Sequence, residues 1–137
     1  PGGRLVSALW VEPESASWWS WPRRILARHV AQPPISFDTP GPFRYGRSET
    51  FHTDLTAAGF DLAHEECLET AVMESHDPQG LVDWCLSFGL ARALTGQPES
   101  VHQAWRRDML AEAESHRCAD GMYRLGGVTR LVVARAA

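Results

Sequence analysis

The chain opens with the stretch PGGRLVSALWV (residues 1–11), in which a Pro-Gly-Gly turn leads directly into an apolar run. Ser7 is the only polar residue between Leu5 and Val11. A short, continuous apolar run is typical of a strand that is buried on both faces in the centre of a parallel sheet. The stretch therefore predicts a central strand that ends before Glu12. Because such a turn usually joins two elements, we expect a further element upstream of it.

Two later segments also predict strands. In residues 60–73 two sets of side chains alternate with a period of two, as they do where successive side chains point to opposite faces of a sheet. Residues 128–135 are rich in β-branched side chains, which favour strands. We expect Gly126 and Gly127 to form a hairpin turn just before this last strand.

Helices are predicted over residues 23–30, 48–59 and 77–96, and from Pro98 onward. Ser48 is placed to cap the second of these helices, and Gly59 to end it in the left-handed conformation. Asp77 is placed to cap the third, with a proline at the first helical position, and Gly96 to end it. An amphipathic helix between the first two strands suits a crossover over one face of the sheet, so the predicted class is α/β.

Composition limits the classes of partner. The chain has 137 residues, which suits one domain, and its net charge of −4 provides no basic field for nucleic acid or an anionic membrane. No run approaches the ~18 apolar residues of a membrane span, and no signal peptide is visible, so we expect a cytoplasmic protein.

Cys67, Cys85 and Cys118 are odd in number and far apart, which argues against a disulfide framework or a four-cysteine zinc site. Buried free thiols are expected instead.

The ordered set of segments resembles the C-terminal half of class I S-adenosylmethionine-dependent methyltransferases, in the ubiquinone-biosynthesis-like branch. The turn and strand at residues 1–10 resemble the turn and fifth strand of that family. The similarity continues through Gly41–Tyr45, Ala57–Phe60, Asp77-Pro78, Trp84, Phe88, Gly89 and Leu131–Arg135. The resemblance implies the last three strands of a Rossmann-like sheet, the final one antiparallel, with inserted helices.

The resemblance implies one domain over residues 1–137. Its expected parts are a turn and strand (1–12), a lid and loop (15–47), a helix and strand (48–76), a helical pair (77–117) and the final strand (121–137). The complete enzyme would use S-adenosylmethionine, held by a glycine-rich loop after an earlier strand. No such loop follows a predicted strand in this sequence, since Gly2-Gly3 precedes its strand. We therefore expect no cofactor bound to this chain and no activity of the chain alone.

Four tryptophans are the candidate substrate-binding residues. Trp18, Trp19 and Trp21 lie in one short stretch and cannot all face one side of a helix, so they suit a cap over a flat or apolar substrate. Trp10 is expected at the carboxyl end of its strand, near the rim of a site. The alternative for all four is core packing against the sheet.

The six histidines show no metal-ligand spacing, and no metal site is expected. His64 and Glu66 are separated from Glu65 and Cys67 by the alternation of a strand, so these four cannot share one face. His29 is the candidate general base for a hydroxyl or amine substrate, with a surface or core histidine as the alternative.

Two functions follow as hypotheses. In the first, the chain is the substrate-capping region of a methyltransferase, with a small-molecule substrate and, as partner, the missing N-terminal half. Self-association through the edge of the first strand is the alternative partnership. In the second, the chain is a non-catalytic small-molecule-binding or assembly module derived from the same fold.

Overall fold

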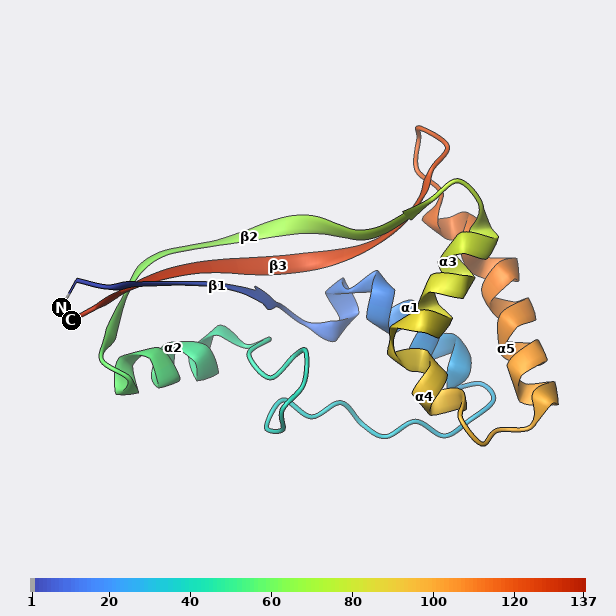
Figure 1. Ribbon diagram of the computed structural model, residues 1–137, viewed down its shortest axis with the longest axis horizontal. Helices are drawn as coiled ribbons and strands as arrows, with labels where there is room; N and C mark the ends of the chain where they lie inside the picture. Colours follow the sequence, from blue (N-terminus) through green and yellow to red (C-terminus); the bar gives the residue numbers. More distant parts are fainter. Residues whose placement is uncertain (1) are drawn as a thin grey trace. The chain divides into compact units, whose positions relative to one another are not determined.

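The computed structural model describes residues 2–137 and, for residues 89 and 91, the backbone alone. Its sheet contains β1 (Arg4–Trp10), β2 (Phe60–Ser75) and β3 (Tyr123–Ala136) in the order β1-β3-β2 (Figure 1). The α-helices are α1 (Ser17–Leu26), α2 (Ser48–Ala57), α3 (Pro78–Cys85), α4 (Ala91–Leu94) and α5 (Glu99–Glu112). Shorter turns are η1 (Pro13–Ser15), the π-helical η2 (Leu86–Leu90) and η3 (Ala113–His116). The chain is therefore mixed α/β, as predicted.

The last strand lies between the other two and runs against them. β3 pairs with β1 in an antiparallel register that runs from Arg4 opposite Arg135 to Trp10 opposite Thr129. In Figure 1 the arrows of β1 and β2 point the same way and that of β3 points the opposite way. The prediction that the final strand is antiparallel is confirmed.

The prediction that the first strand is central and buried on both faces is wrong. Within residues 2–137, β1 has a neighbour on one side only, and exposed residues alternate with half-buried ones along it. Val6 is 66% exposed, whereas Leu5 and Leu9 pack against a cluster of buried residues below the sheet. Apolar residues on the outward face concealed the period of two from which an edge strand would have been predicted.

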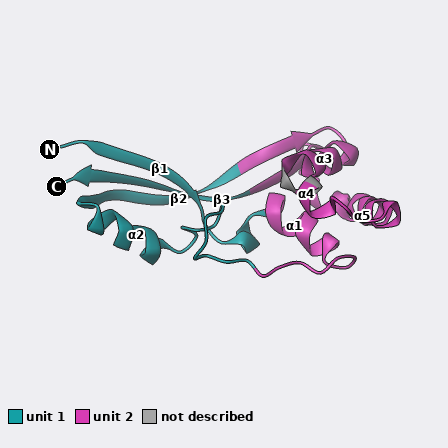
Figure 2. Cartoon of the chain, turned by 60° about the horizontal axis from the view of Figure 1, so that its bottom comes forward, with its two compact units in different colours: residues 1–16, 35–70, 127–137 teal, residues 17–34, 71–126 magenta. Residues whose placement is uncertain are grey.

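The chain forms two compact units, coloured separately in Figure 2. The sheet unit comprises residues 1–16, 35–70 and 127–137, and the helical unit comprises residues 17–34 and 71–126. Phe51 and Leu55 of α2 form the core of the sheet unit together with Val132 and Ala134 of β3. The two side chains of α2 are four residues apart, so they lie on the same face of the helix.

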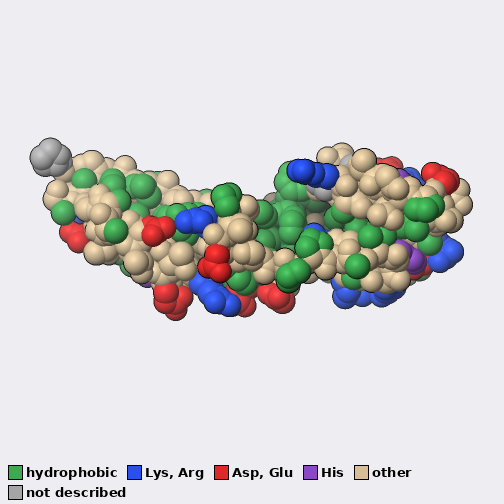
Figure 3. Space-filling view, turned by 90° about the horizontal axis from the view of Figure 1, so that it is seen from below, with side chains coloured by type: hydrophobic (Ala, Val, Ile, Leu, Met, Phe, Trp, Pro, Cys, Tyr) green, Lys and Arg blue, Asp and Glu red, His purple; other side chains and the backbone are tan. Residues whose placement is uncertain are grey.

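The helical unit has a larger apolar interior. Its fully buried side chains include Ile25, Leu26, Leu81, Leu94, Trp105, Met109 and Leu125. Helix α5 contacts both α1 and α3, and its Trp105 and Met109 contribute to this interior. On the molecular face shown in Figure 3, side chains of both charge signs are interspersed with hydrophobic ones.

Local chemistry sets several boundaries as predicted. The Asp77 carboxylate accepts a hydrogen bond of 2.8 Å from the Gly80 backbone N–H, with Pro78 at the first helical position of α3. Gly59 and Gly96 have φ of +78° and +81°, the left-handed conformation expected after a helix. β2 also covers the predicted strand and extends it to Ser75.

Other boundaries differ. Arg47, not Ser48, occupies the cap position of α2, and no side chain caps that helix. The helix predicted over residues 77–96 is interrupted by η2. The turn before the last strand lies at Gly121, with φ of +83°, and the predicted hairpin glycines lie inside β3. A Cβ at Gly127 would lie 3.0 Å from the Ala16 Cα, so this glycine permits a close approach of two backbones.

Candidate functional site

The predicted tryptophan cap lies in α1, which begins at Ser17 and not at residue 23 as predicted. Pro22 lies in the interior of this helix, and its carbonyl accepts a hydrogen bond of 3.2 Å from Trp105 Nε1. Trp18 and Trp21, spaced i and i+3, are 5% and 3% exposed, whereas Trp19 is only half-buried. The expectation that the three tryptophans do not share one buried face is confirmed.

Trp18 and Trp19 belong to an aromatic cluster with Trp84 and Phe88. The ring of Trp18 meets those of Trp19 and Phe88 edge to face, at centroid distances of 5.7 and 5.5 Å. Phe88 in turn stacks on Trp84 at 4.9 Å and remains 55% exposed. Phe88 therefore does not belong to the buried interior of the helices. The aromatic cluster therefore has one apolar surface open to a ligand or partner.

The other two tryptophans that were predicted to bind substrate, Trp21 and Trp10, have other surroundings. Trp21 packs on the imidazole of His116, with ring centroids 4.3 Å apart. Its Nε1 is a buried donor without a hydrogen-bond partner among residues 2–137. Trp10 ends β1 in the sheet unit, and a Cβ at Gly127 would lie 3.0 Å from its ring. Trp21 is thus a core side chain, and Trp10 packs on the backbone of the last strand.

His29 forms a dyad that sequence reasoning missed. Its Nε2 lies 2.9 Å from Oδ2 of Asp108 in α5, and both side chains are about four-fifths buried, with exposures of 18% and 21%. Arg107 hydrogen-bonds the other oxygen of Asp108 at 3.0 Å, and this contact, together with that of His29, lowers the pKa of Asp108. An ionised Asp108 fixes the orientation of the imidazole, an arrangement that suits a general base. No sequence signal joins the two residues, because they are far apart in the chain.

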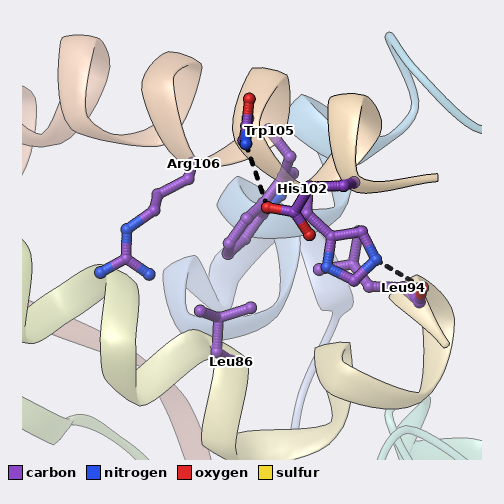
Figure 4. A pocket seen from close by; sticks show the side chains of 7 residues that line it. Leu86, Leu94, His102, Trp105 and Arg106 are labelled. Carbon is purple, nitrogen blue, oxygen red and sulfur yellow. Dashed lines mark hydrogen bonds between the residues drawn. The ribbon is translucent and has the colours of Figure 1, made fainter. Parts of the chain in front are cut away.

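A pocket opens in the helical unit between α5 and the segment formed by η2 and α4 (Figure 4). Its volume is about 210 Å³. It is lined by Leu86, Leu94, Glu99, His102, Gln103, Trp105 and Arg106. Sequence reasoning did not find this pocket, although η2 beside it is π-helical, a conformation that often occurs at functional sites.

The polar groups of the pocket are held by their neighbours. His102 Nε2 lies 3.0 Å from the carbonyl oxygen of Leu94, and since a carbonyl only accepts, this nitrogen carries the proton. Arg106 pairs with Asp83 at 2.7 Å, which compensates its charge. The Gln103 amide donates to Glu99 at 3.2 Å.

The described residues do not fit the glycine-rich cradle that the resemblance implies for S-adenosylmethionine. In residues 2–137 the glycines with positive φ are Gly2, Gly59, Gly96 and Gly121, and none of them follows a strand. Among the same residues, no three His, Cys, Asp or Glu side chains gather as a metal site would require. Helices long and apolar enough to cross a membrane are also absent from this part of the chain.

The cysteines differ in environment, and only one fits the expectation of a buried thiol. Burial raises the pKa of Cys85 to about 12, which makes this thiol unreactive at neutral pH. Cys67 is exposed on β2 and Cys118 is half-buried. The prediction of burial was wrong for Cys67, which lies in a part of β2, residues 66–71, whose side chains are all exposed.

The chain is similar to a crystal structure of a "putative methyltransferase" from Bacillus halodurans C-125, with a TM-score of 0.39 and 17% sequence identity. The similarity covers 98% of this chain and 51% of that structure, so the chain spans about half its length. No protein-family model and no curated protein matches the sequence. The function is therefore argued from the residues themselves.

Proposed function

We propose that this chain is the substrate-capping C-terminal part of a class I S-adenosylmethionine-dependent methyltransferase, of the ubiquinone-biosynthesis-like branch. The observation that carries the proposal is the sheet, in which β1 and β2 run the same way and the final strand runs against them. This is the arrangement that the resemblance implies for the last three strands. The opening turn and the Asp77-Pro78 helix start supply the sequence side of the same argument.

The helical unit suits the role of a cap. In open α/β sheets, ligands bind beyond the carboxyl ends of the strands, and α1 follows the carboxyl end of β1 along the chain. Methyl transfer from a sulfonium requires alignment of the acceptor and exclusion of water more than it requires acid–base help. The aromatic cluster offers an apolar surface for that purpose through Phe88 and Trp19. Where the acceptor is a hydroxyl or amine, His29 oriented by Asp108 is the proposed base.

In this proposal the cofactor is bound by a part of the protein outside residues 1–137, and the chain alone transfers no methyl group. The partner is then the N-terminal half of the enzyme, and the substrate is a small molecule with an apolar or flat region. The proposed enzyme is cytoplasmic.

Calorimetric titration with S-adenosylmethionine tests the proposal, using this chain and the complete protein that we propose contains it. We expect saturable heat from the complete protein and none from the chain. Absence of binding by the complete protein would overturn the methyltransferase assignment. One-to-one binding by the chain alone would overturn the division of roles, because the cofactor would then be held by residues assigned to the cap.

A second candidate, an assembly or binding module without catalysis, is favoured by the exposed edge of β1. Val6 is 66% exposed there, and no charged residue follows Arg4 in the strand. Such an edge is open to pairing with another strand. The calorimetric titration distinguishes the two functions. If the chain is an assembly module, it associates through β1 and the complete protein binds no S-adenosylmethionine.

A further inference from the structure

The pocket beside α5 combines an apolar base with a polar mouth. Trp105 and Leu94 form the base and are 0% and 1% exposed, so water does not reach them. Leu86 also lines the pocket and is half-buried, so part of its side chain is open to solvent. An apolar ring that enters beside Leu86 would be removed from water, which is favourable in proportion to its buried area.

Two of the polar groups that line the pocket, His102 and Glu99, offer hydrogen-bond acceptors. Because His102 Nε2 donates to the Leu94 carbonyl, Nδ1 is the ring nitrogen left for a ligand, and in an imidazole with one proton this nitrogen accepts. Figure 4 shows this second nitrogen on the side of the ring away from Leu94, toward the space between Leu86 and Trp105. The Glu99 carboxylate is a second acceptor at the same opening. A matching ligand therefore brings a donor.

The volume of the pocket and the charges of its lining limit the class of ligand further. A cavity of roughly 150 Å³ lined by apolar side chains accommodates benzene, so a pocket of about 210 Å³ admits one ring with a small substituent. Among the described side chains that line the pocket, Arg106 is a cation whose charge is already paired with Asp83, which argues against an anionic ligand.

We propose that this pocket binds a single-ring aromatic molecule that carries one hydroxyl or amine donor, with the ring beside Leu86 and the donor on His102 Nδ1. The site is independent of the methyltransferase proposal, since it requires neither the cofactor nor any residue outside the helical unit.

The test is fluorine NMR of 4-fluorophenol titrated with the purified chain, with fluorobenzene as the ligand that lacks the donor. We expect saturable one-site binding of 4-fluorophenol and at least about tenfold weaker binding of fluorobenzene, the effect of losing one hydrogen bond. Absence of saturable 4-fluorophenol binding would overturn the site. Equal affinity for the two ligands would overturn the role of His102.

Two variants locate the binding. Leu86→Trp fills the mouth and should abolish binding, whereas Leu62→Trp, at a 48% exposed position on β2, should leave it unchanged. His102→Phe should weaken 4-fluorophenol about tenfold and fluorobenzene little, which provides the test if Leu86→Trp does not fold. Unchanged 4-fluorophenol affinity in either pocket variant would place the ligand elsewhere and overturn the proposal.

Discussion

The interiors of the two units are stabilised by different forces. In the sheet unit, Arg130 is 6% exposed and donates hydrogen bonds of 3.1 and 3.0 Å to the carbonyls of Tyr45 and Gly46. Its Nε lies 3.5 Å from the Glu65 carboxylate on β2. In the helical unit, Trp105 is fully buried and its indole N–H donates a hydrogen bond to the Pro22 carbonyl. Directional polar contacts therefore hold the loop before α2 against β3, whereas close packing and the burial of apolar surface hold α5 in place.

The largest effect is expected from Trp105→Ala. The change removes a fully buried indole and leaves a cavity between α1 and α5, at a cost of about 3–5 kcal/mol in the free energy of unfolding. Urea denaturation measures the loss, and hydrogen exchange locates it. Faster exchange in α1 and α5 than in α2 would sharpen the contrast between the units. A loss below about 1 kcal/mol would show that the helical interior does not depend on this packing.

Arg130→Met should have the next largest effect. Methionine preserves much of the volume, but the carbonyls of Tyr45 and Gly46 lose these hydrogen bonds, and the Glu65 carboxylate loses the guanidinium and keeps its contact with His52. We expect a loss of about 2–4 kcal/mol in the free energy of unfolding, with faster exchange confined to the sheet unit.

Arg124→Met is the matched control for this change, since Arg124 also lies on β3 and pairs with Glu74 and Asp120, but at the surface. Its effect should be much smaller than that of Arg130→Met. Equal effects of the two substitutions would contradict the importance assigned to the buried guanidinium.

A third substitution tests whether the free edge of β1 in the sheet unit pairs with the same strand of a second copy. If two copies pair antiparallel about Ser7, Leu5 lies opposite Leu9 and Arg4 opposite Trp10, so the strand is complementary to itself. β2, the other outer strand, carries Asp61, Glu65, Glu66, Glu69 and Glu74, which disfavour pairing.

We expect the wild-type chain to dimerise at high concentration and Val6→Glu to weaken the dimer at least about tenfold, since two carboxylates would share one face of the pair. Leu68→Glu, at a 46% exposed position on β2, should have no effect. Light scattering distinguishes these outcomes, and a wild-type monomer at high concentration would exclude pairing through β1.

The elements that were predicted correctly from the sequence are those that depend on residues close together in the chain. Asp77 and Pro78 start α3 through bonds within one turn, and residues 60–73 form a strand as their alternation predicted, although residues 66–71 are exposed on both faces. The β-branched final segment likewise became β3. Phe51 and Leu55 are four residues apart, so helical spacing puts them on one face, and both are buried.

The features that were missed depend on contacts distant in sequence. Pro22 was expected to precede a helix, but burial of Trp18 and Trp21 outweighs the lost backbone hydrogen bond and extends α1 through it. Similarly, the partners of His29 and Arg130 are separated from them by most of the chain. No local pattern encodes such pairs, so the candidate site emerged from the fold and not from a motif.

The smallest expected effect is a dependence of stability on pH in the helical unit. Burial, and secondarily the charge of Arg24, lower the pKa of His116 below its usual value of 6.5. Above pH about 6.5 the imidazole is neutral in both states, and its packing on Trp21 contributes fully. As the pH falls below that value, the unfolded chain binds a proton that the folded chain resists, so stability decreases until the folded pKa is reached.

His116→Phe preserves a ring against Trp21 and removes this titration. The urea midpoint of the variant should therefore fall less than that of the wild type between pH 7.5 and pH 5.5, a window in which histidine titrates and ordinary carboxyl groups do not. His64→Phe, at a side chain that is 55% exposed on β2, should follow the wild type. If His116→Phe also follows the wild type, protonation of His116 does not limit the helical unit. The aromatic interior of the helical unit would then tolerate a buried charge as readily as the interior of the sheet unit tolerates Arg130.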